Sequence, residues 1–555
     1  MTAHAPIAAQ LTRISPFSRV YGFGSVYAKT LRDSRLAFII AAGLLGGLAL
    51  FMGAAISTVF PTPESRTEID QLIAGIPPQM VNFFGKPEKL GTLGGYMTWK
   101  YGLTFVLITT VWSVLALSGT LAGEASRGSL DLIATTPLGK RRIALEKVAA
   151  HLTVLVLALG IMAVLTTLSS NAFGDVALGD PISLVSSVGF ALWLGFTGLF
   201  FGGLAFALAP VLGRSGSAGI SAIAAAVLWT AHTMDLGPIA VLSPYRWTGS
   251  HIALVGEYDW AGLALVGVVA VIFLAIGVEL FARRDLGVTA GIGFPTLPSA
   301  VLGIRGPTSR AFGDQLPRAL AWGIGLAVFG AMIASLVGPL SGQLASDENL
   351  LKVLQTLFPG FDLTSAGGFL QLFVELFFIA AGFAAATFVS KWASDETSGR
   401  LETLLATTLR RGRWVIAGAI AALAADAVMT LVFALGIGLG ASSGGVSGTD
   451  PMLGSISLGL YGAALIGIGF AVGGLWRTSL AAEVVALVVV VTYLIDLLAP
   501  AFGLPSWVHQ LALTAHYGQP MTGHWDLVGV VASVAICVVG VGLGAWGMSR
   551  RDVTK

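Results

Sequence analysis

Residues 36–58 read LAFIIAAGLLGGLALFMGAAIST and contain no charged side chain. A helix of this length crosses the roughly 30 Å of hydrocarbon in a bilayer, because each residue adds about 1.5 Å. Similar runs recur along all 555 residues, of which 55% are hydrophobic, and the mean hydropathy is +0.84. Only 11% of the residues are charged, too few to cover several soluble domains. The sequence therefore predicts an all-α polytopic membrane protein.

Twelve apolar segments have the length of a membrane span, six in each half of the chain. The first six lie near 36–58, 98–121, 144–168, 184–210, 218–235 and 260–282. The second six lie near 319–340, 368–391, 414–439, 453–475, 481–500 and 527–548. We expect a cytoplasmic interfacial segment at 1–35, a first six-helix half at 36–290, a connector at 291–318 and a second half at 319–555. No cleavable signal sequence precedes the first span, so we expect that span to be retained.

The basic residues are distributed unevenly between the two sides of this arrangement. Of the 31 Lys and Arg residues, only six fall on one side, and these are Arg66, Lys86, Lys89, Lys100, Arg246 and Lys352. Cationic loops are retained in the cytoplasm, so we expect a multi-pass protein of the plasma membrane with both termini cytoplasmic. Residues 15–35 and 299–318 are either interfacial helices or solvated basic flanks. The long loops on the opposite side are expected to fold into a small cap.

Other bulk features exclude several classes of protein. The net charge of +2 gives no basis for nucleic-acid binding. The single cysteine, Cys537, excludes an intramolecular disulfide and a cysteine metal cluster. The 72 glycines are typical of transmembrane helices that pack through small residues.

One cytoplasmic loop occurs twice. GEASRGSLDLIATTPLGKRR (residues 123–142) follows the second span, and DETSGRLETLLATTLRRGR (395–413) follows the eighth. The last spans of the halves are also followed by similar sequences, FARRDLG (281–287) and MSRRDV (548–553). Because six is an even number, both units enter the membrane in the same direction. The sequence thus predicts two parallel repeats with a pathway between them.

Each repeated loop is longer than a turn needs and has the composition of an amphipathic helix. Its apolar edge consists of Leu130, Leu132 and Ile133 in one copy and Leu401, Leu404 and Leu405 in the other. We expect this edge to contact a cytoplasmic partner with two-fold symmetry. The alternative is a helix that lies on the lipid headgroups.

The loop resembles the second intracellular segment of type-two ABC exporter permeases, which reads roughly E-x-x-x-G-T-L-E-x-L-x-x-T-P. The matching residues of the first copy are Glu124, Gly128, Leu130, Asp131, Leu132, Thr136 and Pro137. Those of the second copy are Glu396, Gly399, Leu401, Glu402, Leu404, Leu405 and Thr408, and Leu409 replaces the proline. The fused twelve-span form is most similar to permeases of actinobacterial polyketide-antibiotic exporters, the tetronasin type.

The resemblance implies that these segments are coupling helices, each docked on one of two copies of a separate cytoplasmic P-loop ATPase. The chain has no G-x-x-x-x-G-K-[ST] motif. ATP and Mg would therefore be bound by the partner, with no cofactor and no catalytic site on this chain. The expected function is export of hydrophobic or amphipathic small molecules, antibiotic or drug-like, by alternating access.

Two acidic residues, Glu375 and Asp426, lie well inside predicted spans, where a charge costs roughly 2.5–3.5 kcal/mol. They are candidates for the translocation pathway between the halves. The alternative is a packing role within one half. His151 and Asp496 lie nearer the ends of spans and are expected to reach the interface.

Two other classes of function fit the sequence less well. A proton-coupled secondary multidrug transporter of the major-facilitator type also has twelve spans in two parallel halves. It lacks support, because the loop after the second span does not contain that family's G-x-x-x-D-[RK]-x-G-[RK] motif. A membrane-embedded enzyme is disfavoured, since no metal-ligand spacing and no nucleophile motif occurs.

Overall fold

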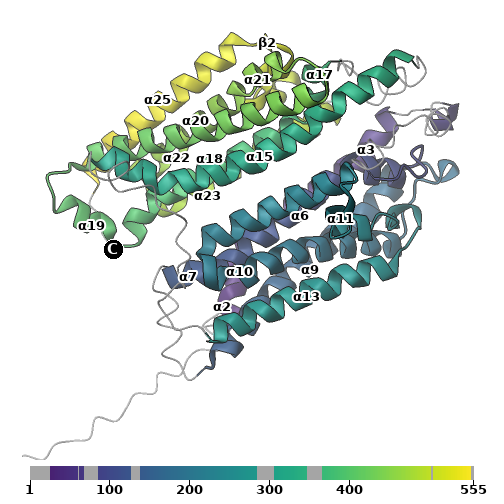
Figure 1. The fold of residues 1–555 in the computed structure, drawn as a ribbon, viewed down its shortest axis with the longest axis horizontal. Helices are drawn as coiled ribbons and strands as arrows, with labels where there is room; N and C mark the ends of the chain where they lie inside the picture. The colour runs from purple at the N-terminus through teal and green to yellow at the C-terminus, as the bar shows by residue number, and fades with distance from the viewer. Residues whose placement is uncertain are drawn as a thin grey trace, which may run out of the picture.

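The structure is a computed structural model, and it describes residues 25–59, 62–64, 66–67, 85–126, 138–283, 306–346, 365–501 and 504–551. Within these residues the protein consists of long helices in two bundles, one from each half of the chain (Figure 1). Ten helices are long and apolar enough to cross a membrane. The α2–α3 pair, bent by 52°, would make an eleventh. The prediction of an all-α polytopic membrane protein is confirmed.

The first bundle contains one short entry helix and five long helices. These are α2 (Val26–Asp33), α3 (Arg35–Val59), α6 (Leu93–Thr120), α9 (Lys140–Phe173), α10 (Leu184–Thr233) and α13 (Trp260–Arg283). Short elements join them: α7 (Ala122–Ser126), η3 (Val176–Leu178), α11 (Gly237–Ala240), α12 (Pro244–Trp247) and η4 (Ala253–Val255).

The second bundle contains six long helices and a cap of short elements. The long helices are α15 (Pro307–Ser346), α18 (Val374–Thr397), α20 (Arg411–Ser443), α22 (Ile456–Leu475), α23 (Thr478–Ala501) and α25 (Leu527–Arg550). The short helices are α17 (Ala366–Gln371), α19 (Arg400–Leu405), α21 (Thr449–Gly454), α24 (Ser506–His509), η5 (Leu513–His516) and η6 (Pro520–Thr522). Strands β1 (Gly518–Gln519) and β2 (His524–Trp525) form a two-stranded antiparallel sheet.

Helix α10 contains a chain reversal at Gly213. Its φ of 71° and ψ of −178° are not helical, and the positive φ favours glycine. The Ser221 hydroxyl donates to the Phe201 carbonyl at 2.5 Å, although these residues would lie about 30 Å apart in a straight helix. Helix α10 therefore consists of two antiparallel segments, in agreement with the separate spans predicted at 184–210 and 218–235. The second segment is not among the ten candidate spans, so the count of twelve stays a prediction.

Equivalent helices pair alike in the two halves. Helix α3 packs on α9 as α15 packs on α20, and α10 packs on α13 as α22 packs on α25. The α22–α25 contact explains part of the glycine content, because a side chain on Gly544 would approach the Phe470 carbonyl to 2.4 Å. Only the absence of a Cβ lets these backbones come so close.

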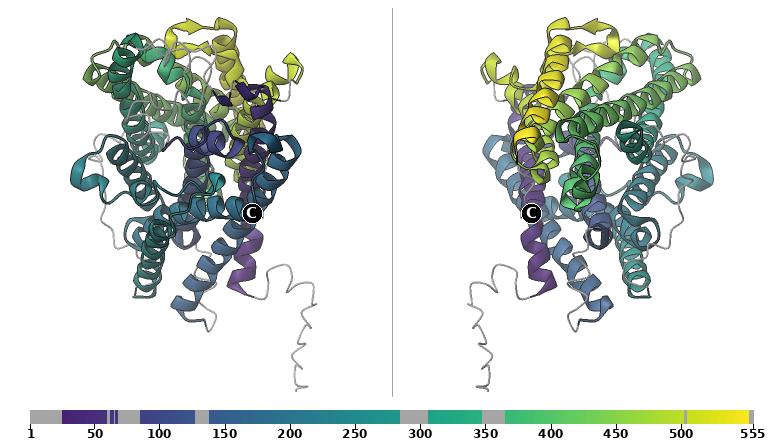
Figure 2. Two further views of the ribbon diagram at one scale, coloured as in Figure 1. Left: turned by 90° about the vertical axis from the view of Figure 1, so that its right-hand side faces the viewer. Right: turned by 90° about the vertical axis from the view of Figure 1, so that its left-hand side faces the viewer.

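The two halves meet through a pair of similar contacts. The second segment of α10 reaches α15, where Gly219 faces Ala321, and α23 reaches α3, where Leu494 faces Gly47. In each case the fifth segment of one half contacts the first helix of the other. Figure 2 views the molecule from its two ends, with most of the second half above the first.

The expected cap is present over the second half. Helices α17 and α21 both pack on η6, and the Met521 amide donates to the Gln371 side chain at 3.2 Å. Over the first half, the Arg66 guanidinium donates to both carboxylate oxygens of the buried Asp180 at 2.7 Å. The cap elements α17, α21 and β2 lie at the end of the molecule opposite α7 and α19 (Figure 1).

Candidate functional site

The repeated loop of the second half forms helix α19 and the turns that flank it. Gly399 precedes the helix with a φ of 75°, a left-handed conformation that allows the chain to turn sharply after α18. Leu401 is buried, whereas Glu402 and Thr408 are exposed and Leu404 is half-buried. The leucine edge of this copy thus packs against the protein itself. The exposed face consists of Arg400, Glu402, Thr403 and residues 406–408, and contact of this segment with a partner stays a prediction.

Glu396, at the end of α18, is held by two other segments of the second half. Its carboxylate accepts bonds from Arg551 at 2.5 and 2.6 Å and from the Thr478 hydroxyl at 2.8 Å. Arg551 follows α25 and also donates to the carbonyls of Gly473 and Trp476. Charge-assisted bonds of this length are strong. Glu396 therefore joins the ends of α18, α22, α23 and α25 beside α19.

The corresponding residue of the first half, Glu124, makes a similar junction. It lies on α7 and forms ion pairs with Lys29 of α2 at 3.0 Å and with Lys147 of α9 at 2.9 Å. The Lys147 side chain is fully buried, and that of Glu124 is 13% exposed. The other residues predicted in this copy lie outside the described residues, and these are Gly128, Leu130, Asp131, Leu132, Thr136 and Pro137.

Helices α7 and α19 lie at the same end of the two bundles, together with α2 and the end of α25 (Figure 1). At that end, the carboxylates of the matching residues Glu124 and Glu396 each bind side chains from two other segments of the chain, and we call these two residues carboxylate hubs. Sequence reasoning identified the glutamates but missed their partners Lys29, Lys147, Thr478 and Arg551. The only available signal was the ARRD and SRRD similarity after the last spans, which marked Arg551 without assigning its contact.

Glu375 of α18 is exposed and interacts electrostatically with Lys100 of α6 and Asp496 of α23. Because α6 belongs to the first half and the other two helices to the second, ionisable side chains from both halves lie near one another here. Lys100 was expected to lie in the outside flank of a span starting near 98. The helix starts earlier, at Leu93, and carries Lys100 inside its apolar length.

Tyrosines surround this charge cluster. The Lys100 ammonium donates to the Tyr96 hydroxyl at 2.8 Å and lies 5.5 Å from the centre of the Tyr101 ring. Tyr493 of α23 also interacts electrostatically with Glu375. Asp496 is tied to the cap, since it accepts a bond from the Thr514 hydroxyl and lies 3.7 Å from His509. The surroundings of Glu375 are thus polar, aromatic and shared by both halves.

Asp426 has different surroundings. It lies on α20 with 2% of its surface exposed, and a side chain at Gly462 of α22 would approach its carboxylate to 2.3 Å. Both helices belong to the second half, so the structure does not bring Asp426 to Glu375 and favours the packing alternative for it. His151 is also buried rather than placed at the interface, and its ring lies 5.8 Å from that of Trp112.

Metal binding finds no support in the part of the chain that the structure describes. No group of three or more His, Cys, Asp or Glu side chains there could hold an ion.

Two comparisons with known proteins agree with this architecture. Residues 304–548 match the family described as "Multidrug efflux system permease Rv1217c, C-terminal domain". The chain is also 28% identical over 575 aligned positions to the multidrug efflux system permease protein Rv1217c of Mycobacterium tuberculosis, a match that covers 98% of this chain and 96% of the relative. The chain resembles a multidrug efflux permease. The likeness extends over both halves, so it includes α7, α19 and the helices that carry Glu375 and Lys100.

Proposed function

We propose that this protein is the membrane permease subunit of an ATP-driven exporter of the ABC type, and that it moves hydrophobic or amphipathic drug-like molecules out of the cell. The observation that carries the proposal is the pair of carboxylate hubs, Glu124 and Glu396, at matching positions of a repeated loop and at one end of the molecule. The efflux activity named for the relative supports the same direction of transport.

In this proposal the chain has twelve spans in two parallel repeats, and α7 and α19 face the cytoplasm of a plasma-membrane protein whose termini are both cytoplasmic. Two copies of a P-loop ATPase bind there, one below each half, and supply ATP and Mg. On the second half, the ATPase contacts the exposed Glu402 and Thr408. Leu401, being buried, transmits the movement to the permease without touching the partner.

The glutamate hubs make this transmission possible. Glu396, at the end of α18 just before α19, joins that end to α22, α23 and α25, so a displacement of the coupling helix that moves the end of α18 also moves these three spans. The contacts between halves, α10 with α15 and α23 with α3, then change as the halves rock. The Glu375 cluster lies between the halves and is the part of the pathway that selects substrates.

The test is purification of the tagged full-length chain from its native membranes in mild detergent, followed by identification of co-purifying proteins and a measurement of vanadate-sensitive ATP hydrolysis. We expect a stoichiometric P-loop ATPase. Glu402→Lys should lower its recovery at least several-fold. The matched control is Asp450→Lys, a charge reversal at an exposed residue of α21 at the opposite end, which should leave recovery unchanged.

Two results would contradict the proposal. One is a chain that purifies alone and supports export without ATP hydrolysis. The other is ATPase recovery that is unchanged by Glu402→Lys and by replacement of both repeated loops with Gly/Ser linkers. Export that instead follows the proton gradient and is lost in Glu375→Gln would establish the secondary transporter of the major-facilitator type.

A further inference from the structure

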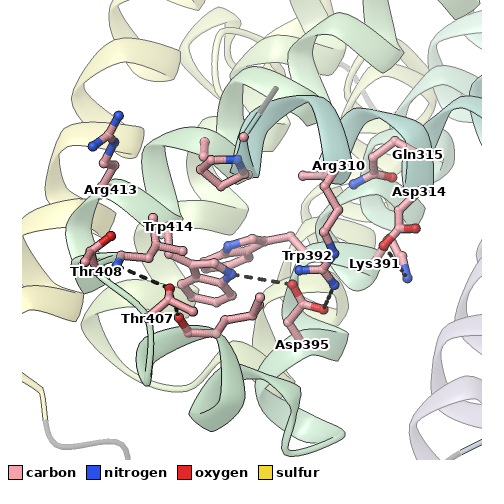
Figure 3. A pocket seen from close by; sticks show the side chains of 17 residues that line it. Arg310, Asp314, Gln315, Lys391, Trp392, Asp395, Thr407, Thr408, Arg413 and Trp414 are labelled. Atoms are coloured by element: carbon pink, nitrogen blue, oxygen red, sulfur yellow. Dashed lines mark hydrogen bonds and ion pairs between the residues drawn. The ribbon is translucent and has the colours of Figure 1, made fainter. Parts of the chain in front are cut away.

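A cavity of about 460 Å³ lies beneath helix α19, at the end of the second half that carries the repeated loop (Figure 3). Its walls come from the start of α15, the end of α18, the start of α20 and the chain that follows α19. The neighbouring site of Glu396 contributes no residue to it. The cavity is therefore separate from the junction described above.

One wall of the cavity is aromatic. The rings of Trp392 and Trp414 stack with centres 4.9 Å apart and an angle of 27° between their planes. Trp392 also stacks on Phe470 of α22, with ring centres 4.1 Å apart. These contacts leave the tryptophan pair little freedom to move, so the wall is formed before any ligand binds.

Three residues that line the cavity each have a polar side-chain atom without a hydrogen-bond partner among the described residues. These atoms are the indole nitrogen of Trp392, the side-chain oxygen of Gln315 and one carboxylate oxygen of Asp395, whose ion-pair partner Arg310 is 3.7 Å away. Trp392 and Gln315 are 4% and 2% exposed, while the amide nitrogen of Gln315 is already used by the Phe388 carbonyl at 2.9 Å. Leaving buried polar atoms unpaired costs about 1–3 kcal/mol each. A ligand that offers both acceptors and donors would remove this cost.

The charges of the cavity favour an anion. Arg310, Lys391 and Arg413 line it, against the two acids Asp314 and Asp395. The ion pairs of these acids are long, since Arg310 lies 3.7 Å from Asp395 and Lys391 lies 3.3 Å from Asp314. Figure 3 shows Arg310 and Lys391 on the same side of the tryptophan pair. A phosphate group would bind Arg310 in a fork geometry that its present contact does not use.

We propose that this cavity binds the headgroup of an anionic phospholipid, a phosphodiester that carries a hydroxyl-bearing alcohol such as glycerol. The phosphate accepts bonds from Arg310 and from the Trp392 indole. The hydroxyls donate to Gln315 and Asp395. Basic pockets between membrane helices on the cytoplasmic side have the chemistry for such headgroups.

Exposed apolar side chains lie on two of the helices that form the cavity. On α20, Ile416 and Ile420 are 47% and 50% exposed, next to the cavity residues Ala417 and Gly418 in sequence. On α15, Leu320 and Ile324 are also exposed. A lipid, unlike a soluble phosphodiester, gains from burying these side chains. This is the reason to choose a lipid as the source of the phosphate.

The position of the cavity gives the lipid a consequence for the coupling helix. Leu404, Thr407 and Leu409, within and after α19, form part of its wall. A bound headgroup would hold α19 against α15, α18 and α20. Bound lipid therefore stabilises the placement of α19.

The experiment measures phospholipid binding to the delipidated full-length chain by native mass spectrometry, with phosphatidylglycerol, phosphatidylcholine and soluble glycerophosphoglycerol as separate probes. We expect phosphatidylglycerol to bind at least tenfold more tightly than phosphatidylcholine. Arg310→Gln and Trp392→Phe should each weaken phosphatidylglycerol binding roughly tenfold. The matched control is Arg477→Gln, which removes an exposed arginine on the same side of the molecule but outside the cavity, and it should bind as the unmodified chain does.

Folding of each variant is checked by its elution profile and by its thermal midpoint without lipid. Trp392→Phe retains an aromatic ring in the stack and loses the indole donor together with part of the ring volume, so its thermal midpoint is compared with that of the unmodified chain. Equal binding of phosphatidylglycerol and phosphatidylcholine would overturn the proposal, as would unchanged binding in both well-folded cavity variants. Glycerophosphoglycerol binding as tight as that of the lipid would retain the phosphodiester site and overturn the lipid as its source.

Discussion

Replacement of Glu124 by glutamine should destabilise the first half more than any other single change at the repeated loops. The Lys147 ammonium is fully buried and lies 2.9 Å from the Glu124 carboxylate, which also pairs with Lys29 at 3.0 Å. Glutamine has almost the same size but no charge, so Glu124→Gln leaves a buried cation without its counter-ion. Breaking a buried pair in this way costs about 3 kcal/mol or more.

The partner substitution should cost much less. Lys147→Met removes the buried cation and retains most of the apolar stem, while Glu124 keeps its pair with Lys29, whose side chain is 31% exposed. Because Glu124 retains one counter-ion and methionine fills most of the space of the lysine stem, Lys147→Met should change stability by about 1 kcal/mol or less. The double variant Glu124→Gln with Lys147→Met should regain most of the stability lost by Glu124→Gln alone, because it contains no stranded buried charge.

The assay is thermal unfolding of the purified chain in one detergent, followed by tryptophan fluorescence. For a unit the size of one half, a loss of about 3 kcal/mol lowers Tm by roughly 6–12 °C. Glu402→Gln serves as the control, because it neutralises an exposed acid on α19 and should leave Tm nearly unchanged. Equal losses in Glu124→Gln and Lys147→Met, or a double variant as unstable as Glu124→Gln, would refute the reasoning.

Three further predictions concern other parts of the molecule. Asp180→Asn should cost about 3 kcal/mol in thermal unfolding, since it strands the buried guanidinium of Arg66, and a loss below about 1 kcal/mol would contradict the role of this pair. Glu375→Gln should lower the export of cationic relative to neutral compounds by roughly tenfold in vesicle transport, because it leaves Lys100 to repel cations, and an unchanged ratio would exclude the cluster from the pathway. Burial lowers the pKa of His251, although the hydrogen bonds of its ring act in the opposite direction. The folded state therefore disfavours protonation of His251, and the stability of the protein should fall as the pH drops below about 6.5. His251→Gln should flatten that part of the stability profile, and an equally steep profile in the variant would assign the dependence to another group.

Much of the helical architecture could be predicted from local sequence. Apolar runs of membrane length coincide with helices throughout the described residues, because a helix in hydrocarbon must satisfy its backbone within the segment. The reversal within α10 could also be predicted, because polar residues around Gly213 separate two apolar runs. The start of α6 at Leu93 was missed, because Tyr96, Trp99 and Lys100 lower the local hydropathy without breaking the helix. Lys100 was therefore counted with the flank of the span, and its electrostatic interaction with Glu375 of the other half was not anticipated.

The sequence predicted the two glutamates of the candidate site but not the residues that bind them. The repeat marked Glu124 and Glu396 as equivalent, but Lys29 is 95 residues from Glu124, and Arg551 is 155 residues from Glu396. The amphipathic pattern of α19 correctly showed one apolar edge. It could not show that Leu401 of that edge packs inward, because the same pattern fits either a partner or the protein's own core.

The sequence by itself determined that this is a membrane protein of long apolar helices with a duplicated loop, since bilayer thickness and hydrocarbon polarity act on each segment separately. The tertiary structure determines which ionisable side chains lie near one another. Glu375 and Asp426 look alike in sequence, as acids among apolar neighbours, yet Glu375 interacts electrostatically with Lys100 of the other half, whereas Asp426 lies between α20 and α22. Such interactions depend on the distances between helices, and those distances are set by the packing of segments far apart in the chain.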